Sequence, residues 1–206
     1  MIRERIKIFN VNYEQIGATY RDEVHLKGYW HEVFHCWVVE KIEHQWHIYL
    51  QLRSYRKKDY PGQYDITAAG HLIEDEIVAD GVRELIEELG IRVSYPQLQF
   101  LGVIPYVIDN EKIKDYEFAN VFLYEHKGGI ERFKIQREEL DGMYRVKLDE
   151  FVRLVQKEVE TIEAQGYKYE VNTKMEQNVQ ISLNEMSALP DSYLSKLIPA
   201  IQNYLM

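Results

Sequence analysis

Residues 68–91, AAGHLIEDEIVADGVRELIEELGI, hold the side chains whose types and spacing most clearly point to chemistry. The segment is crowded with Asp and Glu, and Arg83 is its only Lys or Arg. Like charges at helical spacing destabilise a helix by roughly 0.2–0.5 kcal/mol per pair. A segment of this kind therefore needs a partner that offsets the repulsion, either bulk solvent or a bound cation.

The apolar residues of this segment predict a helix over residues 77–89. They form one stripe along a 3.6-residue helix, at i, i+4, i+7 and i+11: Val78, Val82, Leu85 and Leu89. Glu84, Glu87 and Glu88 form a second stripe facing away from the first, and Gly90 supplies a stop signal. Three carboxylates within one turn suit a hard divalent cation that prefers oxygen ligands. A solvated acidic face is the alternative, but no Lys lies in the helix to relieve the repulsion.

The same residues resemble the signature of the Nudix family. In the family's box, a glycine is followed six residues later by a glutamate and then by Arg-Glu-apolar-x-Glu-Glu-x-Gly-apolar. Here Gly70, Glu76 and the run RELIEELGI from Arg83 to Ile91 match that pattern. One departure is that six residues separate Glu76 from Arg83, where the usual box has seven. Residues 70–91 are therefore similar to a Nudix box with a shortened connection.

The resemblance implies a metal-dependent hydrolase. Four groups would bind Mg²⁺ or Mn²⁺: the side chains of Glu84, Glu87 and Glu88 and the carbonyl of Gly70. Arg83 would hold the loop through a buried ion pair with Glu76. The partner would be a small molecule that carries a diphosphate linked to a nucleoside or another organic group, and cleavage would release a monophosphate. One carboxylate would act as general base, with Glu87 and Glu117 as the two candidates.

Five further residues resemble a metal-binding set in the Nudix subgroup that includes type I isopentenyl-diphosphate isomerases: His25, His31, His71, Asp115 and Glu117. Asp115 and Glu117 lie two apart on an expected strand and hence on one face. In that subgroup, basic residues matching Arg53 and Lys57 grip the substrate diphosphate. The alternatives are histidines that only hydrogen-bond to backbone, and basic residues that are only solvated charges.

The isomerase mechanism of that subgroup also needs a cysteine two residues before the box histidine, where this chain has Ala69. An alanine side chain can neither donate nor accept the proton that an allylic isomerisation moves. The only cysteine, Cys36, alternates with Phe34 and Val38 and is interpreted as a core residue. The residues therefore favour a hydrolase, with an isomerase or a catalytically inactive diphosphate-binding module as alternatives. Four histidines show no pattern that favours function over packing: His35, His44, His47 and His126.

The segments that must position these residues alternate between strand and helix patterns. Four expected strands, rich in β-branched and aromatic residues, cover residues 33–42, 45–53, 98–108 and 117–127. A short strand runs into a helix over 143–162, and residues 191–204 form a C-terminal accessory helix. The segment 166–183 is ambiguous, and we expect it to shape the pocket together with residues 106–114. The pattern is α+β, and the resemblance implies the Nudix α/β/α sandwich with a mixed sheet between helices.

The composition bounds the remaining questions. The 206 residues suit one domain spanning 1–206, and the net charge of −9 argues against duplex nucleic acid as a partner. A single cysteine excludes an intramolecular disulfide and fits a reducing compartment. No apolar run approaches the length of a membrane span or of a signal-peptide core. We therefore expect a cytoplasmic protein with no membrane partner, while several classes of diphosphate substrate and the oligomeric state stay open.

Overall fold

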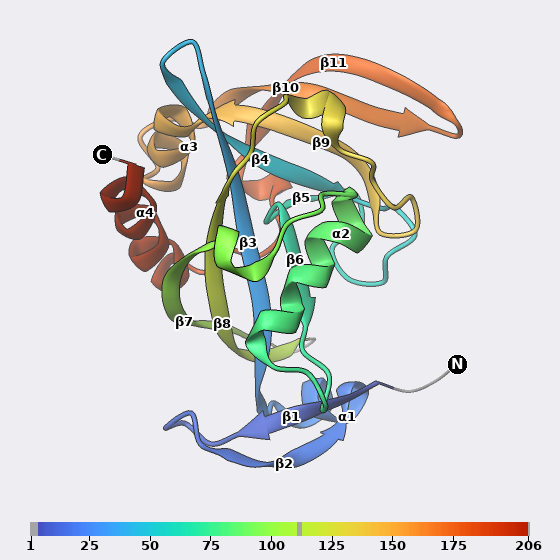
Figure 1. The fold of residues 1–206 in the computed structure, drawn as a ribbon, viewed down its shortest axis with the longest axis vertical. Coiled ribbons are helices and arrows are strands. Elements are labelled where there is room, and N and C mark those ends of the chain that lie inside the picture. The colour runs from blue at the N-terminus through green and yellow to red at the C-terminus, as the bar shows by residue number, and fades with distance from the viewer. Residues whose placement is uncertain (1–3, 111–112, 206) are drawn as a thin grey trace.

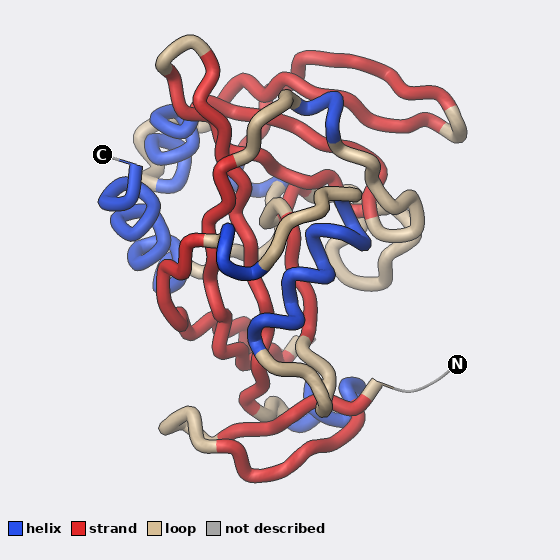
Figure 2. Tube along the Cα trace, in the orientation of Figure 1, coloured by secondary structure: helices blue, strands red, loops and turns tan. Residues whose placement is uncertain are grey.

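The computed structural model describes residues 4–110 and 113–205 of the chain, and strands cover more of the trace than helices do (Figure 2). One mixed sheet has the strand order β11-β10-β9-β4-β3-β1-β2, with β5 paired to β4, β6 and β8 to β3, and β7 to β8. The strands are β1 (Arg5–Phe9), β2 (Gln15–Tyr20), β3 (Trp30–Ile42), β4 (Gln45–Arg53), β5 (Tyr64–Asp65), β6 (Ala68–His71), β7 (Gln99–Asp109), β8 (Lys114–Glu125), β9 (Leu140–Lys147), β10 (Thr161–Glu170) and β11 (Thr173–Ser182).

The long strand β3 is the centre of the molecule, because β1, β4, β6 and β8 all pair with it. Its pairing with β8 is parallel and sets His31 beside Glu117, whereas its pairing with β6 is antiparallel and sets Val33 beside His71. Because side chains alternate along a strand, positions 31, 33, 35 and 37 of β3 share one face of the sheet. This register brings residues from three separate segments to one place.

Helices cover both faces of the sheet. They are α1 (Arg21–Lys27), α2 (Arg83–Leu89), α3 (Leu148–Val155) and α4 (Asp191–Leu205), with 3₁₀ turns at Val78–Val82, Tyr95–Gln97, Ile130–Arg132 and Leu183–Glu185. Leu85 and Leu89 of α2 pack with Phe34 and Val38 of β3, whereas α3 and α4 pack against the opposite side chains, including Trp37. Figure 1 shows α2 lying across β6 and β3, away from α3 and α4. The expected arrangement of a mixed sheet between helices is confirmed.

The C-terminal helix α4 contributes directly to the core. Five of its side chains are buried, and Tyr193 and Leu197 are completely inaccessible to solvent. The ambiguous segment 166–183 forms most of the β10–β11 hairpin, whose ten pairs run from Thr161 with Ser182 to Glu170 with Thr173. At the other end of the chain, β1 and β2 form the end of the sheet that lies at the bottom of Figure 1, with α1 beside them, although the sequence patterns predicted no elements there.

The helix expected over residues 77–89 is shorter than predicted. Residues 78–82 form a 3₁₀ turn, and the α-helix begins only at Arg83. The carboxylate of Asp80 accepts a hydrogen bond from the N–H of Ile77 at 2.8 Å, and Gly81 is a poor helix former. The end of the helix is as predicted: Gly90 adopts the left-handed conformation with φ of 68°, and its N–H donates to the carbonyl of Ile86.

Candidate active site

The helix α2 turns two of its three glutamates inward. Glu84 and Glu88 are only 8% and 7% exposed, and both line a cavity of about 830 Å³ between α2, the sheet and the loop after β4. Glu87 also lines this cavity but stands at its rim, with its side chain 55% exposed. Leu85 and Leu89 anchor the opposite stripe of the helix in the core. The predicted cluster of three carboxylates is therefore assembled at one cavity.

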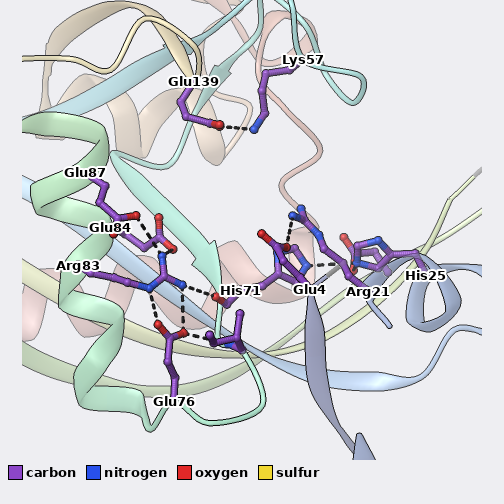
Figure 3. A network of polar contacts seen from close by, with 12 residues as sticks. Glu4, Arg21, His25, Lys57, His71, Glu76, Arg83, Glu84, Glu87 and Glu139 are labelled. Atoms are coloured by element: carbon purple, nitrogen blue, oxygen red, sulfur yellow. Dashed lines mark hydrogen bonds and ion pairs between the residues drawn. The ribbon is translucent and has the colours of Figure 1, made fainter. Parts of the chain in front are cut away.

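Arg83 connects this cluster to the loop that precedes it (Figure 3). Its guanidinium donates to both carboxylate oxygens of Glu76, at 2.5 and 3.0 Å, and to the carbonyl of His71 at 2.9 Å. It also contacts Glu84 at 2.5 Å and Glu87 at 3.3 Å. The structure thus contains the ion pair expected between Arg83 and Glu76 despite the shortened connection. A 3₁₀ turn advances about 2.0 Å per residue against about 1.5 Å in an α-helix, so the turn at Val78–Val82 spans more distance than the same residues would in an α-helix.

The surroundings of the two buried glutamates, Glu84 and Glu88, disfavour the negatively charged form of their carboxyl groups. Burial raises the pKa of Glu84 to about 7, although the charge and hydrogen bonds of Arg83 work in the opposite direction. Burial, and then the neighbouring charge of Glu84, raise the pKa of Glu88 well above its usual value. A divalent cation would supply the charge that stabilises both carboxylates. Glu84, Glu87 and Glu88 therefore fit a Mg²⁺ or Mn²⁺ site.

A second group of candidate ligands meets where α1, β3, β6 and β8 converge. His25 Nε2 lies 3.2 Å from His71 Nε2 and 3.6 Å from Asp115 Oδ1. His31 Nε2 lies 3.5 Å from Asp115 Oδ1 and 3.9 Å from Glu117 Oε1. Two sets within these five residues have all their ligand atoms within 4.8 Å of one another: His25, His31 and His71, and His31, Asp115 and Glu117. All five residues expected for the second metal set are therefore brought together.

The chemistry of this group fits a cation as well. The Nδ1 of His31 lies 3.1 Å from the carbonyl oxygen of Tyr29, which can only accept, so the ring proton sits on Nδ1 and the lone pair on Nε2. Burial lowers the pKa of His31 to about 3, which keeps the ring neutral. Its Nε2 and Asp115 Oδ1 are buried and have no hydrogen-bond partner among the described residues. A neutral imidazole held through its other nitrogen, beside carboxylates, is a typical metal ligand.

The two basic residues singled out by the sequence both line the cavity, but each is already engaged. Arg53 donates to Asp65 at 2.7 Å and to the carbonyl oxygens of Asp59 and Tyr60, so it holds the loop after β4 in place. Lys57 forms an ion pair with Glu139 (Figure 3). Each retains donor capacity toward a ligand, since a guanidinium has five N–H groups and an ammonium three.

Sequence reasoning missed two other cations of the same loop. Arg56 and Lys58 line the cavity, and no ion pair engages either side chain within the described part of the chain. Their run with Lys57 was visible in the sequence, but a loop has no periodicity that tells which of its side chains face inward. Tyr106, Ile108, Ile113 and Lys114 line the cavity as expected, with positions 111–112 outside the described residues. The expectation for 166–183 was wrong, because this hairpin contributes no residue to the cavity lining.

The structure places Ala69 and Cys36 where the sequence suggested. Ala69 lies in β6, lines the cavity, and directs its N–H toward Glu88 Oε2 at 3.4 Å. Cys36 is completely buried on the face of the sheet covered by α2, where burial raises the pKa of its thiol. The chain's only cysteine is therefore outside the cavity.

Comparisons with known proteins relate this chain to a family. No protein-family model matches it. It is 36% identical over 167 residues to the uncharacterized Nudix hydrolase CA_C0446 of Clostridium acetobutylicum, covering 81% of each chain. It is 32% identical over 164 residues to Nudix hydrolase 3 of Arabidopsis thaliana, covering 77% of this chain but only 21% of that protein. A third relative, isopentenyl-diphosphate delta-isomerase 1 of Photorhabdus laumondii, is 28% identical over 126 residues, covering 58% of this chain and 68% of the isomerase.

Solved structures agree on the fold. DR0079 from Deinococcus radiodurans matches with a TM-score of 0.55 and 15% identity, covering 75% of this chain and 90% of that one. The Nudix domain of NrtR from Shewanella oneidensis matches with a TM-score of 0.51 and 13% identity, covering 85% and 88%. No helix within the described ranges is long and apolar enough to cross a membrane. The similarity to CA_C0446, which spans most of both chains, shows that this protein belongs to the Nudix hydrolase family.

Proposed function

We propose that this Nudix hydrolase cleaves, with Mg²⁺ or Mn²⁺, the diphosphate bond of a small molecule in which the diphosphate is linked to a nucleoside or another organic group. One observation carries the proposal. The carboxylates of α2, four members of the histidine–carboxylate group (His25, His71, Asp115 and Glu117) and the cationic loop after β4 all line a single cavity of about 830 Å³, with His31 buried behind them. A volume of this size lies within the range of small-ligand sites and accommodates a diphosphate together with the group attached to it.

The reaction would be a displacement at phosphorus. A water oxygen forms a new bond to phosphorus, the bond from that phosphorus to the bridging oxygen breaks, and the bridging oxygen leaves with the other phosphate. A carboxylate takes the proton that the water gives up. Glu117, which faces His31 from inside the cavity, and Glu87 at its rim are the candidates. Bound cations would neutralise phosphate oxygens and lower the pKa of the attacking water.

The polar groups around the cavity support a nucleotide-like substrate. The bound ligand of the NrtR Nudix domain is ADP-ribose, in which a diphosphate joins two groups that carry hydroxyls. In the present chain, carboxylates and cations line the cavity together with the hydroxyl-bearing side chains of Tyr60, Tyr106 and Ser187. These groups suit a substrate that offers both donors and acceptors beyond its diphosphate.

Isomerisation of an isoprenoid diphosphate is the second candidate. The assembled group of His25, His31, His71, Asp115 and Glu117 and the similarity to the Photorhabdus isomerase favour it. Ala69 opposes it, because a methyl group occupies the position at which the isomerases need a thiol, and Cys36 lies on the other face of the sheet. A module that binds a diphosphate without cleaving it would keep the ligands and show no turnover.

A substrate panel tests the proposal. The full chain would be incubated with ADP-ribose, other nucleoside diphosphate compounds and isopentenyl diphosphate, with MgCl₂ and then MnCl₂. Release of a monophosphate that disappears in Glu87→Gln or Glu117→Gln would support hydrolysis, and a variant that keeps its affinity for Mn²⁺ but loses turnover would identify the base. Rearrangement of isopentenyl diphosphate without phosphate release would favour the isomerase. Metal-dependent binding of a panel member without any product would favour the inactive module.

The cationic loop gives a prediction about substrate affinity. Replacing Arg56 or Lys58 by alanine removes a cation that no acidic partner engages within the described residues, so we expect KM to rise by about 10-fold or more with little change in stability. Arg53→Ala should instead lower the melting temperature as well, because Arg53 holds the loop through Asp65 and two carbonyls. Steady-state kinetics and thermal unfolding measure both effects. Unchanged KM in Arg56→Ala and Lys58→Ala would remove these cations from the site.

The raised pKa of Glu84 predicts how metal binding depends on pH. Below its pKa of about 7, Glu84 holds a proton that the cation must displace, so apparent affinity should fall as pH falls through 7 and rise above it. For one displaced proton the change approaches about tenfold per pH unit. Calorimetric titration with MnCl₂ in two buffers of different ionisation enthalpy counts the released protons. Affinity that is flat between pH 5.5 and 8, with no proton release, would contradict the expectation.

A further inference from the structure

The C-terminal helix reaches the candidate site through one hydroxyl group. Tyr193 of α4 is completely buried, and its hydroxyl oxygen lies 3.0 Å from Trp37 Nε1 and 3.1 Å from His35 Nδ1. Trp37 and His35 stand two residues apart on β3 and so point from the same face of the sheet. The three side chains form a hydrogen-bonded chain that begins in the core and ends at the cavity, which His35 helps to line.

The hydrogen bonds that link Trp37, Tyr193 and His35 have a fixed donor-to-acceptor direction. An indole Nε1–H can only donate, so the Tyr193 oxygen accepts from Trp37. Among the described residues, the remaining partner for the hydrogen of Tyr193 is His35 Nδ1, which must then accept. A protonated Nδ1 would leave that hydroxyl hydrogen buried without an acceptor, which is costly. His35 is therefore neutral, with its proton on Nε2.

The proton on Nε2 faces Glu117. His35 Nε2 lies 3.7 Å from Glu117 Oε2, while His31 Nε2 lies 3.9 Å from the other oxygen, Oε1. His31 has the opposite tautomer, because its Nδ1 donates to the carbonyl of Tyr29 and leaves a lone pair on Nε2. Two histidines four residues apart on β3 thus present different chemistry to the same carboxylate. One offers a hydrogen-bond donor, and the other offers a metal ligand.

We propose that His35 is a positioning residue whose Nε2–H holds Glu117 Oε2, so that Oε1 is directed to the metal group of His31 and Asp115. Tyr193 and Trp37 fix the tautomer that makes this possible, and the same tautomer excludes His35 as a ligand through Nε2. The inference rests on the proposed function, in which Glu117 serves the site. At 3.7 Å the contact is longer than a hydrogen bond, so the proposal requires this distance to shorten when a cation binds.

The tautomer can be measured without any substrate. Long-range ¹H–¹⁵N spectra of the ¹⁵N-labelled full chain report which ring nitrogen carries the proton, and His35→Gln assigns the His35 signals. We expect a protonated Nε2 and an unprotonated Nδ1 in the wild type. Tyr193→Phe should convert His35 to a mixture of tautomers. The matched control is Tyr49→Phe, which removes another buried hydroxyl, one that donates to Glu40, and should leave His35 unchanged. A protonated Nδ1 in the wild type would overturn the inference.

Metal binding tests the consequence for Glu117. Mn²⁺ bound to the full chain would be counted by electron paramagnetic resonance in wild type, His31→Gln, His35→Leu and His35→Gln. Loss of a hydrogen bond to a ligand typically weakens metal binding by about 10–100-fold, so His35→Leu should weaken one site by that factor. His35→Gln keeps an N–H donor and should remain within a few-fold of wild type. Equal affinity in wild type and His35→Leu, with a site lost in His31→Gln, would overturn the positioning role alone. Unchanged binding in His31→Gln would overturn the proposed metal group and the inference with it.

Discussion

Replacing Glu88 by glutamine is expected to reduce diphosphate hydrolysis by at least about 100-fold while leaving the fold intact. Even residues that only orient a metal ligand typically contribute 10–100-fold, and Glu88 is proposed to be a ligand itself. The Glu88 side chain is 7% exposed and lies beside Glu84 and the N–H of Ala69. A carboxylate on the protein surface therefore cannot replace it as a metal ligand.

The stability of the same variant separates loss of metal from loss of fold. Burial raises the pKa of Glu88 well above its usual value, which favours the neutral carboxylic acid in the metal-free wild type, and glutamine resembles that acid in size and hydrogen bonding. Unfolding of the metal-free proteins should therefore occur at similar temperatures. Saturating MnCl₂ should stabilise the wild type, by about 2.7 kcal/mol at 100 times the dissociation constant of one site, and Glu88→Gln much less.

The measurement is a pair of thermal unfolding curves with and without MnCl₂, followed by turnover of the best substrate in the panel. Glu176→Gln is the matched control, because Glu176 is an exposed carboxylate of β11, a strand that contributes no residue to the cavity lining. Full activity in Glu88→Gln would contradict the assignment of Glu88 to the metal site. Equal loss of activity in Glu176→Gln would show that the assay responds to net charge instead.

The parts of this site that could be predicted from the sequence are those that lie close together in the chain. Glu84, Glu87 and Glu88 share one helical turn, and helical periodicity alone puts them on one side of α2. The pairing of Asp115 with Glu117 follows in the same way from the alternation of a strand. Long strands such as β3 and β8 were also recognised, because their β-branched and aromatic composition extends over many residues.

Contacts between distant segments could not be predicted by the same reasoning. Tyr193 and His35 are separated by 158 positions, and only the packing of α4 on β3 brings them together. His35 showed no motif, and its role follows from which partner donates and which accepts. Arg56 and Lys58 lie in a loop, where no repeat relates sequence position to direction. The start of α2 was misplaced because apolar spacing reports neither the hydrogen bond from Ile77 N–H to Asp80 nor the poor helix propensity of Gly81, which also packs against Phe34.

Adding a methyl group should have different effects at two glycines of the box segment, Gly70 and Gly81, because each stands against a different side chain. Gly70→Ala should abolish most of the activity with little loss of stability. A Cβ on Gly70 would lie 2.0 Å from Glu84 Oε1 and 2.2 Å from its Cδ, so the carboxylate must leave its present position. The displaced atoms are the end of a flexible side chain, and Gly70 has ordinary strand backbone, which any residue adopts without strain.

Gly81→Ala is the matched comparison. Its Cβ would lie 2.5 Å from Cγ and Cδ2 of Phe34, a fully buried ring that stacks on Phe122 and has no space to move away. Overpacking of this kind typically costs about 1–3 kcal/mol, so this variant should unfold at a temperature several degrees lower. Because Phe34 holds no metal, the fraction that stays folded should retain its affinity for Mn²⁺.

Thermal unfolding and Mn²⁺ titration of the two variants therefore give opposite patterns if Glu84 is a metal ligand. Gly70→Ala should keep its metal-free melting temperature and lose Mn²⁺ affinity by about 10-fold or more, since a misplaced ligand weakens a site at least as much as an unsupported one. Gly81→Ala should lose melting temperature and keep affinity. Retained affinity in Gly70→Ala would mean that the cation does not require Glu84 where it now stands, and the site would then have to be built on Glu87 and Glu88 alone.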